Sequence, residues 1–307
     1  MQSRRLGLVS TRLRYFQTVV QLGSIRRAAQ TLHVVPSAIS RMIRQLEQEL
    51  GTPLFERARQ RLRLTSAGEI LVYHARTSGM ELDRASAFIG DLQGLKQGSV
   101  SIAAVESATR GLLPDVLSRF WQRYPEIVVK VRTAGSSEAL QAVLNSDCDL
   151  AVAFDVRVSK SARRLAGATL RLGALVRPDH RLAGRREARL RDFAGERLLL
   201  SDASLTLGST VEAAMMESAV ELGARSITNS IHLMADFALR GLGTTFQTRV
   251  GVERELERRE LVFIPLSDPQ LRPRKLLLIA RSKVHLPEAP AALAKMLSEA
   301  IGALDPA

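Results

Sequence analysis

The sequence has little of several things that define whole classes of protein. It contains one cysteine, Cys148, which excludes an internal disulfide and any metal site built on several cysteines. No apolar run approaches the roughly 18 residues of a membrane span. The apolar stretch after Arg4 and Arg5 is shorter than the roughly 7–15 apolar residues of a signal peptide. We therefore expect a cytoplasmic protein with no membrane partner.

Residues that mark an enzyme or a cofactor site are also missing. The five histidines are scattered, without a pair at the spacing that a metal ion requires. No glycine-rich phosphate loop, nucleophile elbow or carboxylate pair with a supporting base is present. The sequence therefore predicts no catalytic residue, no metal and no cofactor.

Lysine is scarce as well, with six lysines against 38 arginines. The arginine total alone is typical of a genome whose codon composition favours arginine, but its distribution along the chain is uneven. Residues 1–64 hold twelve arginines, no lysine and three acidic residues, so this segment carries +9 of the net charge of +13. Such an asymmetric basic segment favours a polyanion as partner.

The same basic segment has the apolar spacing of three short helices. The first helix ends at Gly23, Ser24 is placed to cap a second, and Pro36 suits the first turn of a third. In the second helix, Ala28 and Ala29 are small enough to let another helix cross closely. The third helix has an inward-facing apolar stripe formed by Ile39, Ile43, Leu46 and Leu50. This spacing predicts a helix–turn–helix unit.

The outer face of the third helix is polar and basic near its start, the part that enters the major groove in a helix–turn–helix unit. The residues that we predict to meet DNA there are Pro36, Ser37, Ser40, Arg41 and Arg44. After Gly51, residues 53–64 are typical of a hairpin or wing, whose arginines are Arg57, Arg59, Arg61 and Arg63. Small side chains near base edges and arginines near phosphates favour double-stranded DNA as the partner.

A long helix is predicted over residues 65–92, which contain no proline. Ser66 and Glu69 fit a capping pattern at its start. Small and apolar residues alternate along it at steps of four and three: Leu71, Ala75, Ser78, Leu82, Ala85, Ile89 and Leu92. Such a heptad seam favours pairing with a second copy of the helix. The alternative is an amphipathic helix that lies on its own domain. Residues 94–99 are typical of a hinge.

From residue 100 the pattern changes to strands alternating with helices. The predicted strands cover residues 100–105, 127–133 and 150–154, and the helices between them 112–124 and 138–145. This order predicts a parallel sheet with right-handed crossovers. A second, similar half begins near Ala168, with strands over 170–176, 198–200 and 261–266 and a helix over 209–222. Residues 276–280 and 289–304 are expected to return to the first half.

In its N-terminal segment the chain resembles the LysR-type transcriptional regulators. The residues that carry the resemblance form a long match without gaps: Gly23-Ser24, Ala28-Ala29, Leu32, Pro36-Ser37-Ala38-Ile39-Ser40, Ile43, Leu46-Glu47, Leu50-Gly51, Pro53-Leu54-Phe55-Glu56-Arg57 and Leu64-Thr65-Ser66-Ala67-Gly68. One departure is Val35, where the family usually has Ser, Thr or Ala. Because valine has no oxygen to cap a helix, we expect a frayed start of the third helix or a cap from a neighbour.

Weaker motifs extend the resemblance over almost the whole chain: Leu112-Leu113-Pro114, Phe120, Tyr124-Pro125, Gly135, Leu140, Asp149-Leu150-Ala151 and Gly241-Leu242-Gly243. Another departure is Gln247, where the family often has proline. The resemblance implies an α/β chain with an N-terminal winged helix–turn–helix (1–64), a linker and dimerisation helix (65–95) and a two-lobed, periplasmic-binding-protein-like effector domain (96–307). Lobe 1 would take about 99–166 and 268–305, and lobe 2 about 167–267. A homodimer that assembles into a homotetramer is implied too.

A small-molecule effector is expected where the strands end, because open α/β sheets bind ligands beyond the carboxyl ends of their strands. The segments after the first two strands, 106–109 and 135–137, both open helices, and helix N-termini favour anions. The resemblance places effector contacts at Ser107 and Ser136, with Thr245 and Gln247 facing them from the second lobe. The predicted effector-binding residues are Ser107, Thr109, Ser136, Ser137, Thr245 and Gln247. The predicted effector is a carboxylate or a zwitterion.

Alternatives remain at this point. The serines are also ordinary helix caps, and Glu106 would favour an amine-bearing effector only if it points into the cleft. An effector-responsive transcriptional regulator is the function that the residues favour. The rivals are a DNA-binding regulator whose second domain is a ligand-free oligomerisation scaffold, and a solute-binding or enzymatic α/β protein with an incidental basic N-terminus.

Overall fold

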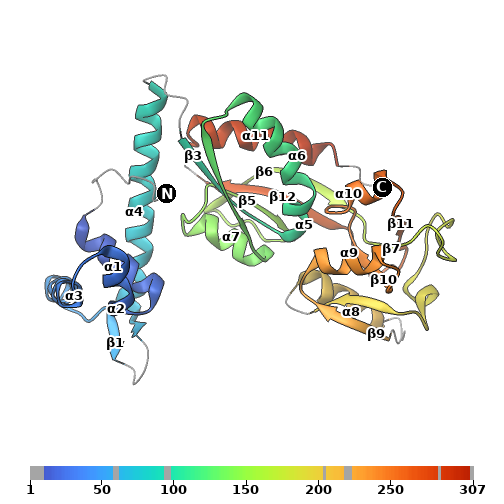
Figure 1. Cartoon of the computed structure of the whole chain (residues 1–307), viewed down its shortest axis with the longest axis horizontal. Coiled ribbons are helices and arrows are strands. Elements are labelled where there is room, and N and C mark those ends of the chain that lie inside the picture. The colour runs from blue at the N-terminus through green and yellow to red at the C-terminus, as the bar shows by residue number, and fades with distance from the viewer. Residues whose placement is uncertain are drawn as a thin grey trace. The chain divides into compact units, whose positions relative to one another are not determined.

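The computed structural model describes residues 10–57, 62–92, 98–202, 205–217, 223–282 and 285–304. The chain divides into an N-terminal unit that ends near residue 95 and a C-terminal unit that holds nearly all of the remainder. In Figure 1 the first unit is blue to cyan and the second runs from green to red. Each unit has its own buried apolar core.

The N-terminal unit begins with three helices, α1 (Thr11–Leu22), α2 (Ile25–Leu32) and α3 (Pro36–Leu50). Residues with positive φ separate them, Gly23 at 62° and His33 at 55°. Ser24 caps α2, because its Oγ accepts a hydrogen bond from the backbone N–H of Arg27 at 3.3 Å. The predicted helix ends and the Ser24 cap are confirmed.

Small side chains bring these helices close together. Ala28 and Ala29 are buried in the apolar cluster that also holds Ile39 and Ile43. The predicted apolar stripe of α3 is wrong at its last member, Leu50, which is 50% exposed. Leu50 is the final residue of α3 and lies beyond the part of the helix that the core covers.

A short antiparallel hairpin follows α3. Its strands are β1 (Phe55–Arg57) and β2 (Leu62–Leu64). Glu47 of α3 fixes the chain just before the hairpin, since its Oε1 accepts a hydrogen bond from the N–H of Leu54 at 2.8 Å. The predicted wing is confirmed, and its residues Arg59 and Arg61 lie outside the described part of the chain.

Helix α4 (Ser66–Leu92) is the predicted long helix, with a different cap. Thr65 caps it rather than Ser66, because the Thr65 Oγ1 accepts a hydrogen bond from the N–H of Gly68 at 3.1 Å. Gly68 is required at this position, since a Cβ would lie 2.2 Å from the carbonyl oxygen of Leu54. The start of α4 is thus locked against the segment that leads into the wing.

The apolar side chains of α4 have two kinds of surroundings. Leu71, the first residue of the predicted seam, packs against the core of the N-terminal unit. Ile70, Tyr73 and Ile89 are exposed. The helix therefore stabilises its own unit with one face near its start and leaves other apolar side chains uncovered.

In its described residues the C-terminal unit holds two five-stranded sheets (Figure 1). The first has the order β4-β3-β5-β12-β6, and we call it, with its helices, lobe 1. Its strands are β3 (Gly98–Ala104), β4 (Ile127–Thr133), β5 (Leu150–Phe154), β6 (Ala162–Leu170) and β12 (Arg274–Arg281). Its helices are α5 (Glu106–Arg110), α6 (Leu112–Arg123), α7 (Ser136–Leu144) and α11 (Glu288–Gly302). Strands β3, β4 and β5 are parallel, as predicted.

The second sheet has the order β11-β7-β10-β8-β9, and with its helices it forms lobe 2. Its strands are β7 (Gly173–Val176), β8 (Leu198–Ser201), β9 (Ala224–Thr228), β10 (Thr244–Gln247) and β11 (Val262–Pro265). Its helices are η1 (Leu190–Phe193), α8 (Thr206–Glu217), α9 (Ile231–Leu239) and α10 (Glu253–Glu257). Strand β10 is parallel to β8 and antiparallel to β7.

One predicted strand and two predicted helices differ from the structure in their bounds. The single strand predicted over 170–176 is two strands in different sheets, because the chain crosses from lobe 1 to lobe 2 between Leu170 and Gly173. Strand β12 returns to lobe 1 as predicted, and it runs antiparallel to β5 because it enters from the lobe 2 side. Helices α7 and α8 begin at Ser136 and Thr206, earlier than predicted, and residues 218–222 lie outside the described part.

Candidate DNA-binding and ligand-binding sites

The predicted DNA-contacting residues of α3 share one surface. Pro36, Ser37, Arg41 and Arg44 are exposed, and Ser40 is partly buried. Among the residues that the structure describes, neither arginine forms an ion pair with a carboxylate. Their positive charge is therefore not neutralised by a carboxylate of the described residues, which suits a phosphate-binding surface.

Val35 occupies the N-cap position of α3 and gives no side-chain hydrogen bond. Its side chain is 63% exposed. The first turn is held by the backbone instead, where the N–H of Ala38 donates to the carbonyl of Val35 at 3.0 Å. The third helix thus begins at Pro36 without a side-chain cap from Val35.

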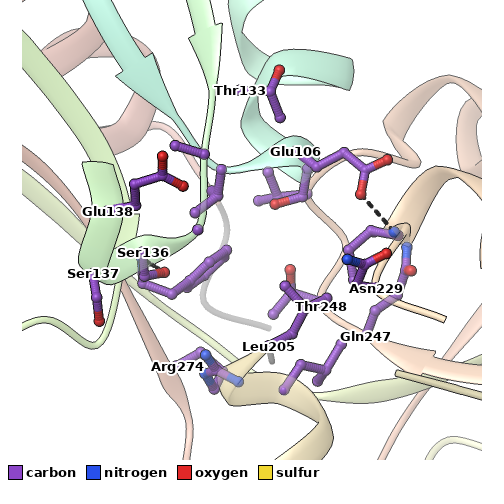
Figure 2. A pocket seen from close by; sticks show the side chains of 18 of the residues that line it. Glu106, Thr133, Ser136, Ser137, Glu138, Leu205, Asn229, Gln247, Thr248 and Arg274 are labelled. Carbon is purple, nitrogen blue, oxygen red and sulfur yellow. Dashed lines mark hydrogen bonds between the residues drawn. The ribbon is translucent and has the colours of Figure 1, made fainter. Parts of the chain in front are cut away.

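A cavity of about 690 Å³ lies between the two lobes. Lobe 1 contributes the ends of β3 and β4 and the starts of α5 and α7, and lobe 2 contributes the end of β10 and the approach to α9. Figure 2 shows side chains from both lobes around this space. We call it the interlobe cavity.

The predicted effector residues fall into two groups. Those that line the interlobe cavity are Ser107, Ser136, Ser137 and Gln247. Thr109 is not among the lining residues, and its hydroxyl donates to the carbonyl of Glu106 at 2.8 Å. Thr245 is fully buried outside the lining, with its hydroxyl 3.5 Å from Sδ of Met234. The structure therefore brings four of the six together.

The polar groups in the lining differ in how far they are already bonded. Ser136 Oγ accepts a hydrogen bond from the N–H of Phe154 at 3.0 Å, which ties α7 to β5 and leaves its hydroxyl proton for another acceptor. Gln247 is 2% exposed, and within the described residues neither its amide nitrogen nor its amide oxygen has a partner. An unsatisfied buried polar group costs about 1–3 kcal/mol, so this amide gains from any new partner.

Glu106 lies at the cavity wall and turns toward lobe 2 (Figure 2). Its carboxylate accepts hydrogen bonds from Ser230 Oγ at 2.8 Å and from the N–H of Ile231 at 2.7 Å. The negative charge thus caps the N-terminus of α9, where the helix dipole stabilises it. Glu106 is a link between the lobes.

Arg110, one turn further along α5, makes a second link to lobe 2. Its Nη1 donates to the carbonyl of Gly251 at 2.8 Å, and its Nη2 donates to Glu255 at 2.7 Å. Beside it, burial raises the pKa of Glu253 above the ordinary value of a glutamate. A Cβ on Gly111 would lie 2.2 Å from that carboxylate. Helix α5 therefore carries both a part of the cavity wall and contacts between the lobes.

Arg274 is a cavity residue that no sequence pattern predicts. It is 5% exposed, its Nε donates to the carboxylate of Asp155, and its guanidinium carbon lies 5.4 Å from the ring centroid of Phe154. It reaches the cavity because β12 pairs with β5, with Leu276 opposite Phe154. Asp155 is 119 positions away in the chain, so local spacing carries no signal for this pair.

A helix–turn–helix unit with a free basic face, in one chain with a two-lobed domain around a cavity, defines the class of ligand-controlled DNA-binding regulators. The chain belongs to the LysR family. Residues 10–69 match the family model described as bacterial regulatory helix-turn-helix protein, lysR family, and residues 93–302 match the LysR substrate binding domain. It is a DNA-binding transcriptional regulator with an effector-binding domain, and the family is not one of enzymes.

Relatives and solved structures agree with this assignment. The RuBisCO operon transcriptional regulator of Allochromatium vinosum is 29% identical over 293 residues, which cover 94% of this chain and 95% of that protein. The probable RuBisCO transcriptional regulator of Synechocystis sp. is 26% identical over 266 residues, covering 85% and 77%. A full-length OxyR variant from Pseudomonas aeruginosa has a TM-score of 0.68 at 19% identity, covering 97% and 95%. CbnR in complex with its target DNA has a TM-score of 0.63 at 18% identity, covering 94% and 98%.

Within the described ranges, none of the helices combines the length and the apolar character that crossing a membrane demands.

Proposed function

We propose that this regulator responds to a small carboxylate or zwitterion held in the interlobe cavity. The observation that carries the proposal is the meeting of three donors at that cavity: the start of α7, the serine hydroxyls and the buried Arg274. The first N–H groups of α7 have no acceptor within the helix, and the helix dipole favours an anion there. The planar guanidinium suits a carboxylate in two-point contact.

The charge balance of the cavity supports a ligand of low net charge. Each charged lining residue already has a partner: Glu138 pairs with Arg132, Arg274 pairs with Asp155, and Glu106 caps α9. A charged ligand that enters the interlobe cavity therefore meets partial charges and hydroxyl groups rather than an unpaired ionised side chain. A single carboxylate, or a zwitterion whose ammonium group approaches Glu138, fits this balance.

The test is a thermal-shift screen of full-length protein against small carboxylates, amino acids and aromatic acids. We expect the compounds that raise the unfolding temperature of the wild type to lose their effect in a Ser107→Ala/Ser136→Ala variant. Thr109→Ala/Ser298→Ala is the matched control, since it also removes two hydroxyls and neither residue lines the cavity. A serine variant that keeps every hit rules out these contacts.

For the DNA surface, we propose that Pro36, Ser37 and Ser40 approach base edges. The residues proposed to hold phosphates are Arg41, Arg44, Arg57, Arg59 and Arg61. Loss of one phosphate contact lowers the slope of log affinity against log salt concentration by about 0.9. Arg41→Ala and Arg61→Ala should each show this change in anisotropy titrations, and Arg27→Ala on α2 should not. An unchanged slope for Arg41→Ala contradicts its phosphate role.

We also propose a homodimer through α4 that assembles into a homotetramer. The exposed apolar residues Ile70, Tyr73 and Ile89 support this, because exposed apolar side chains on a long helix favour pairing. Sedimentation of an Ile89→Glu variant should give a lower mass than the wild type. Equal masses contradict a role for this part of α4.

We infer that α5 couples the cavity to the arrangement of the lobes. Ser107 lines the cavity, while Glu106 and Arg110 on the same short helix bind lobe 2. A ligand that contacts Ser107 would therefore shift the balance of these interlobe bonds. An effector alters DNA binding in this way only if it binds the two arrangements of the lobes with different affinity.

A further inference from the structure

We propose that lobe 2 carries a second ligand site, for a small, multiply charged anion such as a phosphate monoester. A cavity of about 650 Å³ lies at the end of β7 and the starts of β8 and β10. The interlobe cavity lies at the opposite ends of the same strands. We call the second space the arginine cavity. Four arginines and two carboxylates line it: Arg177, Arg181, Arg197, Arg240, Asp179 and Glu196.

The two carboxylates of the arginine cavity are already bonded. Arg177 Nε donates to Asp179 at 3.2 Å, and Arg181 Nη2 donates to Glu196 at 2.7 Å. Glu196 also accepts a hydrogen bond from the Thr244 hydroxyl at 3.1 Å. These pairs neutralise two of the four arginines.

The guanidinium groups of Arg197 and Arg240 are not part of these pairs. With the residues that the structure describes, the side chains of Arg197 and Arg240 form neither a hydrogen bond nor an ion pair, and both are exposed. Two positive charges without partners therefore face one concave surface. Charge of one sign in a cavity attracts a counter-ion more strongly than the same charge on a flat surface.

A structural role at the end of α9 does not account for Arg240. Basic side chains near a helix C-terminus often bond the last carbonyl groups. Here the carbonyls of residues 236, 237 and 238 accept hydrogen bonds from the backbone N–H groups of residues 240, 242 and 241. The carbonyl of Leu239 accepts from Arg177 Nη1 at 3.3 Å. The helix end is thus satisfied without the Arg240 side chain.

The turn Gly241-Leu242-Gly243 shapes the arginine cavity. A Cβ on Gly243 would lie 2.3 Å from the carbonyl oxygen of Arg197, so only glycine lets the turn approach β8 this closely. Gly241 has φ 69°, and a Cβ there would lie 3.1 Å from Cδ of Arg177. The glycines therefore bring the segments of Arg197 and Arg240 to one site.

The ligand class follows from the arginines. Each guanidinium can bind two oxygens of a phosphoryl group at once, and two unpaired guanidiniums balance a dianion. The interlobe cavity, whose charges are paired, suits a ligand with at most one net charge. The chain would then receive two chemically different signals at two sites.

The test is isothermal titration of full-length protein with inorganic pyrophosphate and, separately, inorganic phosphate, at constant ionic strength. Because the basic N-terminal unit would also attract pyrophosphate, two variants with the same loss of charge are compared. Arg197→Ala/Arg240→Ala changes the proposed site, and Arg163→Ala/Arg164→Ala removes two exposed arginines from β6 of lobe 1. We expect at least a tenfold weaker affinity for pyrophosphate in the first variant and the wild-type affinity in the second.

Three results would overturn the proposal. The first is equal pyrophosphate affinity in the two variants. The second is acetate binding as tight as that of pyrophosphate at equal ionic strength, which would make the effect simple screening. The third is an Arg197→Ala/Arg240→Ala variant that loses affinity for DNA but keeps that for pyrophosphate, which would make this surface a contact for nucleic acid. Circular dichroism of each variant verifies that it is folded.

Discussion

The two cavities of the C-terminal unit are nearly equal in volume, about 690 and 650 Å³, but their charges are arranged differently. At the interlobe cavity each charged lining residue is bonded within the protein. At the arginine cavity two guanidiniums remain without a partner among the described residues. Volume alone therefore does not select a ligand. The difference indicates that paired charges stabilise the fold around the interlobe cavity, while unpaired charges are available for binding.

The largest effect on the free energy of unfolding is expected from a substitution of Arg274, the buried cation of the interlobe cavity. Arg274→Ala leaves Asp155 without its ion partner, and we expect a loss of about 2–3 kcal/mol in the free energy of unfolding. Arg132→Ala removes an exposed pair at the same cavity and should cost at most about 0.5 kcal/mol. Urea unfolding of both variants gives the comparison. Equal losses would mean that burial of the pair does not matter.

A smaller loss of stability is expected from substitutions of Glu106. Glu106→Ala removes the carboxylate that caps the start of α9 beside its N-cap Ser230, and it should cost about 1 kcal/mol, while Glu106→Gln keeps one acceptor and should cost less. The matched control is Glu138→Gln, whose carboxylate is exposed beside Arg132. Thermal unfolding of the three variants ranks them. A control as unstable as Glu106→Ala would show that the cap is not the cause.

The smallest change in the free energy of unfolding is expected from substitutions at the arginine cavity. Because Arg197 and Arg240 make no internal bonds with described residues, the Arg197→Ala/Arg240→Ala variant should change the free energy of unfolding by at most about 0.5 kcal/mol. The same urea titrations measure it. A loss above about 1.5 kcal/mol would show that these arginines stabilise the fold, and the contrast between the two cavities would fail.

The sequence predicted best what depends on neighbouring residues. Gly23, Ser24 and Pro36 define helix ends through local φ preferences and capping, and all three act as expected. The parallel strands of lobe 1 were also predicted, because each is a short apolar run between helices. For the same reason the cavity lining at Ser107 and Ser136 was found, since each follows directly after a predicted strand.

Long-range pairing explains what the sequence did not predict. Arg274 reaches the cavity only through the pairing of β12 with β5, which joins segments more than 100 positions apart. The split between β6 and β7 was not predicted, because only Arg171 and Leu172 separate the two strands in the sequence. Thr245 is on the same face of β10 as Gln247 but two residues further from the cavity end of the strand, where it is fully buried against Met234. Such errors are expected wherever register decides the outcome.

The most direct test of the account measures whether the interlobe cavity controls DNA binding. The Kd for labelled DNA from upstream of the neighbouring gene is measured by fluorescence anisotropy at fixed salt, without and with the carboxylate that gives the largest thermal shift. We predict at least about a fivefold change in Kd, typical of coupling between two sites, and no change in the Ser107→Ala/Ser136→Ala variant. An identical Kd for the wild type in both conditions would contradict an effector role for this cavity.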